Sequence, residues 1–299
     1  MAKFDGVLLC SDYDNTIVDT AAVMRGEIEE SLPGERTIKA LEYFMANGGR
    51  FAVATGRALA AFASHAKNVP SNTPAILYNG GALYDFATKT LLESDYLNDK
   101  ALERVQVVLE RWSGIGAEAY NDSLDIPTIH PNAVTLRHQK MANTGSKAYE
   151  KLTDVPMPVG KILLEGDHDL LQQAHDYLHA QPWSGEYEVI FSGINLLEIT
   201  AKGANKGNMV RRLARRLEIP MDHVYCIGDE TNDISMLTIA KEGFAPANCV
   251  QAVKDCGATI VSDKNHDALA DVIEILDRYY LVFRESRRRL PPGSFCIYA

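Results

Sequence analysis

Two acidic residues with a fixed spacing follow one of the short apolar runs of the sequence. Asp12 and Asp14 come directly after the run at residues 7–10, and one residue separates them. If the extended backbone continues, side chains at this spacing lie on the same face, about 7 Å apart along the chain. Two carboxylates that close repel each other, and a hard divalent cation relieves the repulsion. The pair therefore predicts a cation site, with Mg²⁺ as the ion.

Further polar clusters follow three other apolar runs. After residues 51–54, 75–78 and 224–227 come, in turn, Thr55-Gly56-Arg57, Asn79-Gly80-Gly81 and the segment that contains Asp229, Glu230, Asn232 and Asp233. Each cluster alone is typical of a turn or a helix cap. The carboxyl ends of parallel strands, however, meet at one edge of a sheet, where ligands bind. We therefore expect all four clusters to line one crevice.

The side chains of this crevice suit a phosphate group. Asp229 and Asp233 add oxygen ligands of the kind that Mg²⁺ prefers. Lys206, near the start of a predicted helix, adds a positive charge, and Thr55 adds a neutral donor. The sequence contains neither the G-x-S-x-G pattern of serine hydrolases nor the G-x-x-x-x-G-K-[ST] loop that binds nucleoside triphosphates.

The elements that must position these residues indicate an α/β fold. Five short apolar runs, at residues 7–10, 51–54, 75–78, 224–227 and 259–261, predict buried strands of a Rossmann-like parallel sheet. Helical patterns at residues 38–45 and 209–217 lie between them, and Asn47-Gly48-Gly49 predicts the end of the first. The segment at residues 287–293 breaks the helical pattern and predicts a loosely held tail.

The pattern changes between residues 82 and 200. Segments of alternating polarity at 117–120, 187–191 and 195–200 are typical of half-solvated antiparallel strands, and helices are expected near 99–112 and 169–178. We therefore predict a core domain at residues 1–81 and 201–299, and an inserted α+β cap at 82–200. Gly80-Gly81 and Lys202-Gly203 would be the linkers, because glycine permits the backbone to bend.

Composition narrows the class of protein. The 299 residues carry a formal charge of −10, which disfavours a protein that follows the nucleic-acid backbone. The five cysteines are scattered without a C-x-x-C motif, which disfavours a disulfide framework and a zinc site and favours a cytoplasmic location. Neither a signal peptide nor a membrane-spanning run is expected. The oligomeric state is left open.

Four of these features resemble the four motifs of the haloacid dehalogenase superfamily, and the resemblance extends over nearly the whole chain. In order they are Asp12-Tyr13-Asp14-Asn15-Thr16, Thr55-Gly56-Arg57, Lys206 and the segment at residues 228–233. It implies that Asp12 is a nucleophile and Asp14 a general acid and base. It also implies that Thr55, Lys206 and Asn232 hold the phosphoryl group. Asp229 would ligate Mg²⁺ together with Asp12 and the backbone carbonyl of Asp14, with Asp233 supporting the metal site. Glu230 is left open between a supporting role near the metal and a solvated side chain.

The position of the insertion resembles the cap of Cof-type phosphatases, a C2 cap of type IIB. This resemblance implies a Mg²⁺-dependent phosphomonoesterase that forms an aspartyl phosphate and acts on a small phosphorylated metabolite, such as a sugar phosphate. Specificity would come from the cap and from residues beside the crevice. The candidates for contacts with the substrate are Gly56, Arg57, Asn79, His130, Arg137, His138 and Lys161.

Two other functions fit the same residues. A phosphotransferase or mutase would return the phosphoryl group to a hydroxyl group instead of water. A phospho-ligand sensor would use the crevice without turnover, as response-regulator receivers use strand-end acids and a lysine. The long insertion and the Asp12-x-Asp14 pair disfavour a receiver, because a signalling domain needs neither a lid nor a proton donor beside its nucleophile.

Overall fold

The apolar runs of the sequence supply most strands of a five-stranded parallel sheet. The computed structural model describes residues 2–121, 125–142 and 144–288, and the sheet has the order β14-β13-β12-β1-β2. Its strands are β1 (Leu8–Ser11), β2 (Arg50–Val53), β12 (Val224–Ile227), β13 (Glu242–Pro246) and β14 (Thr259–Val261). β1 lies between β2 and β12, with Cys10 opposite both Ala52 and Cys226. The segments that follow these three strands therefore emerge at one edge.

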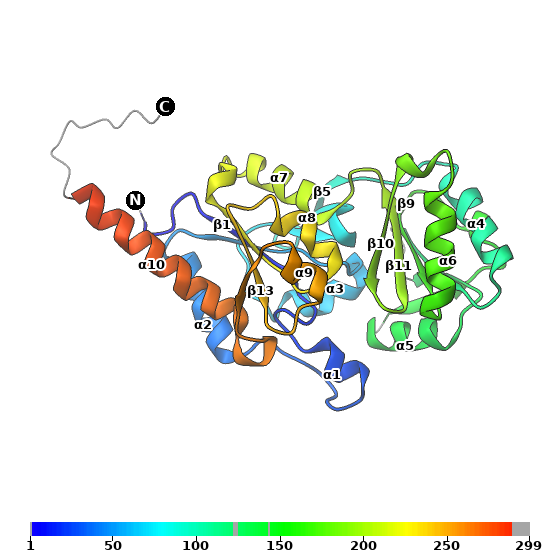
Figure 1. The fold of residues 1–299 in the computed structure, drawn as a ribbon, viewed down its shortest axis with the longest axis horizontal. Coiled ribbons are helices and arrows are strands. Elements are labelled where there is room, and N and C mark those ends of the chain that lie inside the picture. Colours follow the sequence, from blue (N-terminus) through cyan, green and yellow to red (C-terminus); the bar gives the residue numbers. More distant parts are fainter. Residues whose placement is uncertain (1, 122–124, 143, 289–299) are drawn as a thin grey trace.

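Helices cover both faces of this sheet, as expected for buried parallel strands. On one face, Phe44 of α2 (Glu35–Ala46) and Leu276 of α10 (Ala268–Arg288) pack in the same apolar cluster. On the other face lie α7 (Lys206–Arg216), α8 (Ile234–Leu237) and α9 (Gln251–Asp255). Figure 1 shows these layers around the sheet. The predicted turn after α2 is present, with Gly48 at a φ of +92°.

The third predicted strand does not join the parallel sheet, so this part of the prediction is wrong. β3 (Ala75–Leu77) pairs antiparallel with β4 (Ala82–Asp85), which pairs with β5 (Thr90–Ser94). A single parallel bridge, Ala54 to Ile76, connects it to the core. The physical reason is the turn at Gly80, whose φ of +97° reverses the chain and lets β4 pair with β3.

The far edge of the parallel sheet also differs from the prediction. β14 forms at the predicted residues but is an edge strand, and Ile260 is 45% exposed. β13 was not predicted, because Gly243 and Pro246 interrupt its short apolar run.

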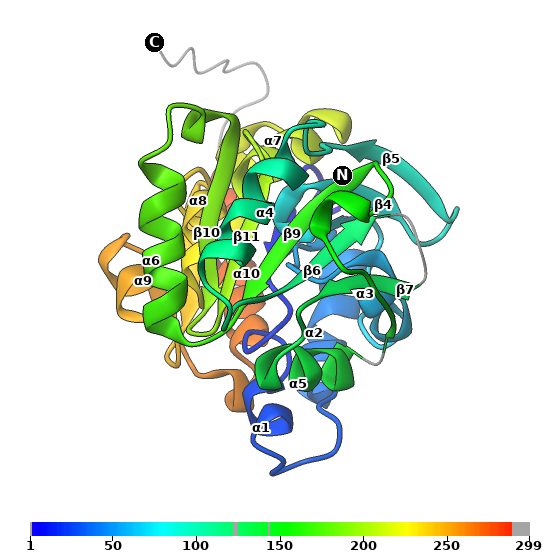
Figure 2. The same cartoon turned by 90° about the vertical axis from the view of Figure 1, so that its right-hand side faces the viewer.

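The inserted segment folds into a six-stranded sheet with the order β10-β11-β9-β6-β7-β8. Its strands are β6 (Gly116–Asn121), β7 (Asp125–Ile129), β8 (Gly145–Ala148), β9 (Val159–Glu165), β10 (Tyr187–Gly193) and β11 (Leu196–Ala201). The neighbouring strands are antiparallel, as predicted, except that β7 and β8 run parallel. α4 (Ala101–Arg111) and α6 (His168–His179) cover one face, near the predicted helix positions (Figure 2).

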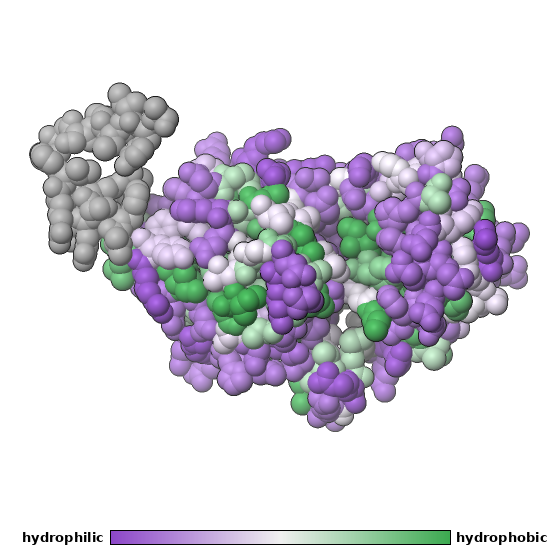
Figure 3. Space-filling view, in the orientation of Figure 1, coloured by the Kyte–Doolittle hydropathy of each residue, from purple (hydrophilic) through white to green (hydrophobic). Residues whose placement is uncertain are grey.

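The two faces of the cap sheet differ in what covers them. Apolar residues of α6 such as Leu171 pack on one face, and Figure 3 shows the outer surface of this helix as mainly hydrophilic. On the other face, Tyr120 and Leu163 pack against Ala58 and Ala61 of the core. The second face therefore meets the core beside the predicted crevice.

The remaining elements are short. They are the helices α1 (Thr20–Met24), α3 (Leu59–Ala66) and α5 (Ala133–Ala142), and the 3₁₀ turns η1 (Tyr78–Gly80), η2 (Leu152–Asp154), η3 (Ser184–Glu186), η4 (Met221–His223), η5 (Thr231–Asp233) and η6 (Lys264–His266). α10 continues through Arg288, so the predicted loosely held tail begins too early, and residues 289–293 lie outside the described part of the chain. No helix in the described part is long and apolar enough to cross a membrane.

The division into a core at residues 1–81 and 201–299 and a cap at 82–200 stays a proposal. Both linker glycines take positive φ values, +97° at Gly80 and +81° at Gly203. A Cβ atom on Gly80 would lie 2.2 Å from the carbonyl oxygen of Asn205, so the two linkers are packed against each other. β4 and β5 pair with β3, and Leu83 lies in a core cluster. This packing favours counting β4 and β5 with the core.

Candidate active site

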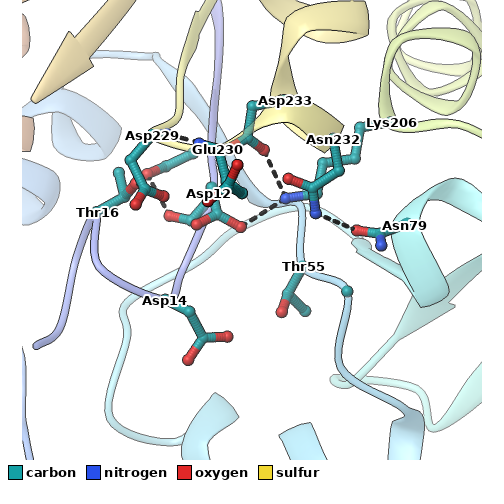
Figure 4. Close-up of polar contacts among 12 residues, drawn as sticks. Asp12, Asp14, Thr16, Thr55, Asn79, Lys206, Asp229, Glu230, Asn232 and Asp233 are labelled. Carbon is teal, nitrogen blue, oxygen red and sulfur yellow. Dashed lines mark hydrogen bonds and ion pairs between the residues drawn. The ribbon is translucent and has the colours of Figure 1, made fainter. Parts of the chain in front are cut away.

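The end of β1 places Asp12 next to a fully buried lysine. Lys206 is the first residue of α7, whose N-cap is the side chain of Asn205. Its Nζ lies 2.5 Å from Asp12 Oδ1 and 2.6 Å from Asp233 Oδ1 (Figure 4). Burial alone would lower the pKa of Lys206, but the two carboxylates outweigh burial and raise it. Lys206 is therefore a fixed positive charge between two acids that come from different strand ends.

Asp233 holds the loop after β12 as well as the lysine. Its Oδ2 accepts the backbone N–H groups of Asp229 and Glu230, at 2.9 Å and 3.0 Å. The Glu230 side chain in turn accepts the N–H and hydroxyl of Thr231, at 2.9 Å and 2.8 Å, and completes a capping box. Glu230 thus caps η5, which accounts for its position. Both oxygens of Asp233 are occupied.

Asp12 and Asp229 remain open to a cation. Oxygens of Asp12, Asp229 and Asp233 all lie within 4.8 Å of one another. Asp229 accepts one hydrogen bond, from the Thr16 hydroxyl at 3.2 Å. Burial and then the charge of Asp12 raise the pKa of Asp229 well above its ordinary value. Burial likewise raises the pKa of Asp12 to about 8, although Lys206 opposes this. All the ligand atoms that these acids offer are oxygens, and together they carry excess negative charge. The cluster therefore fits a hard divalent cation.

Asp14 lies away from this cluster. Figure 4 shows its side chain separate from the carboxylates of Asp12 and Asp229. Arg57 binds it through Nη2, at 2.7 Å from Oδ1, and through Nε, at 3.0 Å from Oδ2, and the Thr20 hydroxyl donates to Oδ1 at 2.5 Å. Burial would raise the pKa of Asp14, but the charge and hydrogen bonds of Arg57 outweigh it and lower the pKa. Asp14 is thus held as a carboxylate.

The predicted phosphate contacts gather beside Lys206. Thr55 is fully buried, and its Oγ1 accepts the N–H of Arg57 at 3.1 Å, which leaves its own proton to donate. Asn232 donates to Asn79 at 2.9 Å. A Cβ atom on Gly56 would lie 2.9 Å from Asn79 Oδ1, so this position requires a glycine or a shift of Asn79.

The cap reaches the site through Lys161. Its Nζ donates to the Gly56 carbonyl oxygen at 2.7 Å, lies 3.2 Å from Glu198 Oε1, and sits 4.6 Å from the ring centre of Tyr120. Glu198 also accepts a hydrogen bond from the amide of Asn79. Core and cap are therefore connected by a chain of hydrogen bonds at the edge of the crevice.

Sequence reasoning missed Glu198 and Tyr120. A signal was present in the segments of alternating polarity at 117–120 and 195–200, because Tyr120 and Glu198 are polar residues among apolar ones and such positions mark a face that meets something polar. Among the described residues, the other cap candidates make no hydrogen bond or ion pair with Thr55, Asn79 or Lys206. His130 and Arg137 are exposed, and His138 belongs to a separate cluster with Glu118 and Glu165.

A family model described as haloacid dehalogenase-like hydrolase matches residues 9–273. The chain belongs to this family. The resemblance drawn from the motifs is thereby confirmed, and so is the expectation of a hydrolase.

Two relatives that align over most of the chain are named as phosphatases. The chain is 29% identical over 248 residues to the pyridoxal phosphate phosphatase YbhA of Escherichia coli (strain K12). This alignment covers 79% of this chain and 89% of the relative. The chain is also 26% identical over 288 residues to the 5-amino-6-(5-phospho-D-ribitylamino)uracil phosphatase YwtE of Bacillus subtilis (strain 168). This alignment covers 89% of this chain and 96% of the relative. These matches support the prediction of a phosphoric monoester hydrolase.

Solved structures confirm the fold. A haloacid dehalogenase-like hydrolase from Bacteroides thetaiotaomicron aligns with a TM-score of 0.75 and 22% identity, covering 90% of this chain and 99% of that chain. A sugar phosphatase of HAD subclass IIB aligns with a TM-score of 0.75 and 18% identity. This alignment covers 91% of this chain and 99% of that chain. The α/β core with an inserted α+β cap is therefore the fold of this protein.

Proposed function

We propose that the protein is a Mg²⁺-dependent phosphomonoesterase that forms an aspartyl phosphate on Asp12. One observation carries the proposal: Asp12, Lys206 and Asp229, far apart in the sequence, lie together at the carboxyl edge of the parallel sheet. Phosphate monoesters hydrolyse very slowly without a catalyst, so a nucleophile, charge stabilisation and proton transfer must act together. The site offers groups for all three.

Asp12 is the nucleophile of the proposed reaction. Its carboxylate attacks phosphorus, and the bond from phosphorus to the ester oxygen of the substrate breaks. Attack requires the ionised form, whereas burial raises the pKa of Asp12 to about 8. Lys206, 2.5 Å away, favours the carboxylate. A second positive charge nearby would favour the carboxylate further.

The buried acids of the site carry more negative charge than Lys206 balances, so they can bind a second cation. Asp12, Asp229 and the backbone carbonyl of Asp14 would hold Mg²⁺, and Asp233 would orient the loop without giving up an oxygen. When bound, the ion would supply positive charge to the phosphate oxygens and to the two acids. Mg²⁺ fits better than a softer metal because all the available donors are oxygens.

The phosphoryl group would lie between Thr55 and Lys206. The free proton of Thr55 and the ammonium of Lys206 donate to phosphate oxygens, and the amide of Asn232 orients them from the other side. These groups are buried or half-buried and are held by hydrogen bonds before the substrate arrives. Their preorganisation favours the transition state, because little rearrangement is needed when charge develops.

Asp14 would transfer the protons. It donates a proton to the leaving oxygen in the first step and accepts one from water in the second. The ion pair with Arg57 favours the carboxylate, which suits the second step. The first step needs Asp14 in its protonated form. We therefore infer that the substrate draws Arg57 away from Asp14 and so raises the pKa of the acid when it binds.

The substrate proposed is a small sugar phosphate. The cap face beside the site presents a tyrosine, a lysine and a glutamate, and such groups suit a hydroxyl-bearing leaving group. The names of the relatives, which specify pyridoxal phosphate and a phosphoribityl compound, support a small phosphorylated metabolite.

A screen of phosphorylated metabolites with Mg²⁺ tests the proposal, with Asp12→Asn as the inactive control and Asp222→Asn, an exposed acid, as the matched active control. Release of inorganic phosphate that requires both Mg²⁺ and Asp12 supports it. Isomerised product without free phosphate would show a mutase instead. Binding of phosphate esters without turnover across the panel would show a sensor.

A further inference from the structure

The cap contains a second cluster of buried acids, away from the proposed active site. Glu118 on β6 and Glu165 on β9 are buried, with 1% and 0% exposure, and His138 on α5 faces both. His138 Nδ1 lies 2.9 Å from Glu118 Oε2 and 3.1 Å from Glu165 Oε1. Ligand atoms of all three residues lie within 4.8 Å of one another.

The cluster is distinct from the phosphate site. Glu165 and Lys161 lie on the same strand and the same sheet face, and four residues of extended chain span about 13 Å. Lys161 is the residue that reaches the Gly56 carbonyl oxygen. The cluster is therefore a separate group of side chains, connected to the end of the cap that contacts the core loop through Tyr120, whose hydroxyl donates to Glu118.

Hydrogen bonds within the described part of the chain do not satisfy these acids. Both oxygens of Glu165 and Oε1 of Glu118 are buried without a well-aligned hydrogen bond there, and the donors near Glu165 are His138 and Thr135. Glu118 Oε2 accepts the Tyr120 hydroxyl at 2.5 Å, and one proton on His138 Nδ1 can serve only one of the two acids. Buried acids left unpaired in this way are costly, so their negative charge calls for a further positive partner.

The neighbouring cation is already engaged. Lys161, on the same face of the sheet, is paired with Glu198 and donates to Gly56. A single imidazolium would leave one negative charge of the two carboxylates unbalanced. A divalent ion would balance both carboxylates and would coordinate an oxygen of each.

We propose that Glu118, His138 and Glu165 form a second metal site, which takes a divalent transition-metal ion of the Zn²⁺ type. Carboxylate oxygens and imidazole nitrogens are both ligands of Zn²⁺, and a site with three protein ligands leaves a fourth position for water. Metal–ligand bonds of about 2.1 Å in a tetrahedral site separate ligand atoms by about 3.4 Å. The observed 2.9 Å and 3.1 Å come within a few tenths of an ångström of that spacing.

The imidazole nitrogen gives this site a different metal preference from that of the proposed active site. The oxygen-only cluster around Asp12 suits Mg²⁺, whereas an imidazole favours a transition metal. The His138 side chain is 21% exposed and provides access from solvent. Binding releases the proton of Nδ1 where the imidazole carries one. The ion would fasten α5 to β6 and β9.

Titration calorimetry of the full chain with Zn²⁺ in millimolar Mg²⁺ tests the proposal, because the excess Mg²⁺ occupies the core acids. We expect one Zn²⁺ per chain, binding more than about 100-fold more weakly in Glu165→Gln and in His138→Gln. Asp229→Asn and the exposed Glu103→Gln are the controls and should keep the Zn²⁺ affinity. The readout does not depend on phosphatase activity, so the proposed function can fail without this site failing.

A second set of measurements distinguishes loss of the metal site from failure of a variant to fold. Co²⁺ bound to the parent protein should show visible d–d bands that Glu118→Gln and His138→Gln lack, and Zn²⁺ should raise the melting temperature of the parent but not of Glu165→Gln. Absence of Zn²⁺ binding in excess Mg²⁺ would overturn the proposal. So would Zn²⁺ binding that Asp229→Asn abolishes and Glu165→Gln leaves intact.

Discussion

The acidic cluster of the core and that of the cap differ in how their charge is balanced. In the core, Lys206 lies fully buried between Asp12 and Asp233, and the second oxygen of Asp233 is held by backbone N–H groups. In the cap, a half-buried imidazole faces Glu118 and Glu165, and no lysine enters the cluster among the described residues. The core therefore has a permanent cation beside its proposed nucleophile, and the cap cluster does not.

This difference bears on what each cluster can bind. A fixed ammonium next to open carboxylates lets the core accept both a divalent cation and a phosphate anion. The cap cluster, with one nitrogen and no fixed cation, suits a metal ion alone. Similar acids in the two lobes thus point to different chemistry because of the cation that accompanies them.

The largest expected effect comes from removing Asp12, the proposed nucleophile of the core. Asp12→Asn should lower Mg²⁺-dependent phosphate release by about 10⁴-fold or more, because an amide does not form the aspartyl phosphate. Steady-state assays on a substrate found in the metabolite screen measure this. Circular dichroism should show a retained fold, and Asp222→Asn should keep full activity. Residual activity within tenfold of the parent would contradict the role of Asp12.

Removing Lys206, the fixed cation of the core, should also destabilise the folded protein. Lys206→Met leaves Asp12 and Asp233 buried without their partner, and we expect the free energy of unfolding to fall by about 3–5 kcal/mol. Lys202→Met is the control, because Lys202 is 63% exposed and lies 3.3 Å from Glu188; its loss should cost less than about 1 kcal/mol. Urea unfolding compares the two. Equal losses would show that Lys206 does not balance the buried acids.

A smaller effect is expected where the cap meets the core. Lys161→Met removes the donor to the Gly56 carbonyl oxygen and leaves Glu198 unpaired. We expect KM to rise about tenfold and kcat to change less, because the residue binds and orders the crevice without touching the phosphoryl group. Lys147→Met, exposed on β8, is the control. A fall in kcat alone would contradict this assignment.

The smallest effect concerns pH. Arg57 lowers the pKa of Asp14 below its ordinary value of 3.8 in the folded protein, so the pair stabilises the fold above that pH and loses its effect as pH falls through the folded pKa. Arg57→Gln should therefore lower the free energy of unfolding at neutral pH by about 1 kcal/mol, since Asp14 remains partly exposed. Chemical unfolding at several pH values should show this difference vanish in acid. A difference that grows in acid would contradict the pairing.

Much of the core could be predicted from local sequence. Strands β1, β2 and β12 are short runs of large apolar residues, and α2 ends at the predicted glycine turn. β3 has the same composition but lies in another sheet, because the turn at Gly80 decides its partner. Local composition therefore predicts that a strand exists, and pairing depends on the turns that connect it.

Residue types and order along the chain were enough to determine the family and the positions of the acids at the ends of β1 and β12, because a parallel sheet brings its strand ends to one edge. Only the tertiary structure decided the charge balance. The hydrogen bonds that occupy Asp233, the pairing of Arg57 with Asp14 and the meeting of Glu118, His138 and Glu165 all join elements distant in sequence. Burial and distance set these interactions, and both depend on how the elements pack in three dimensions.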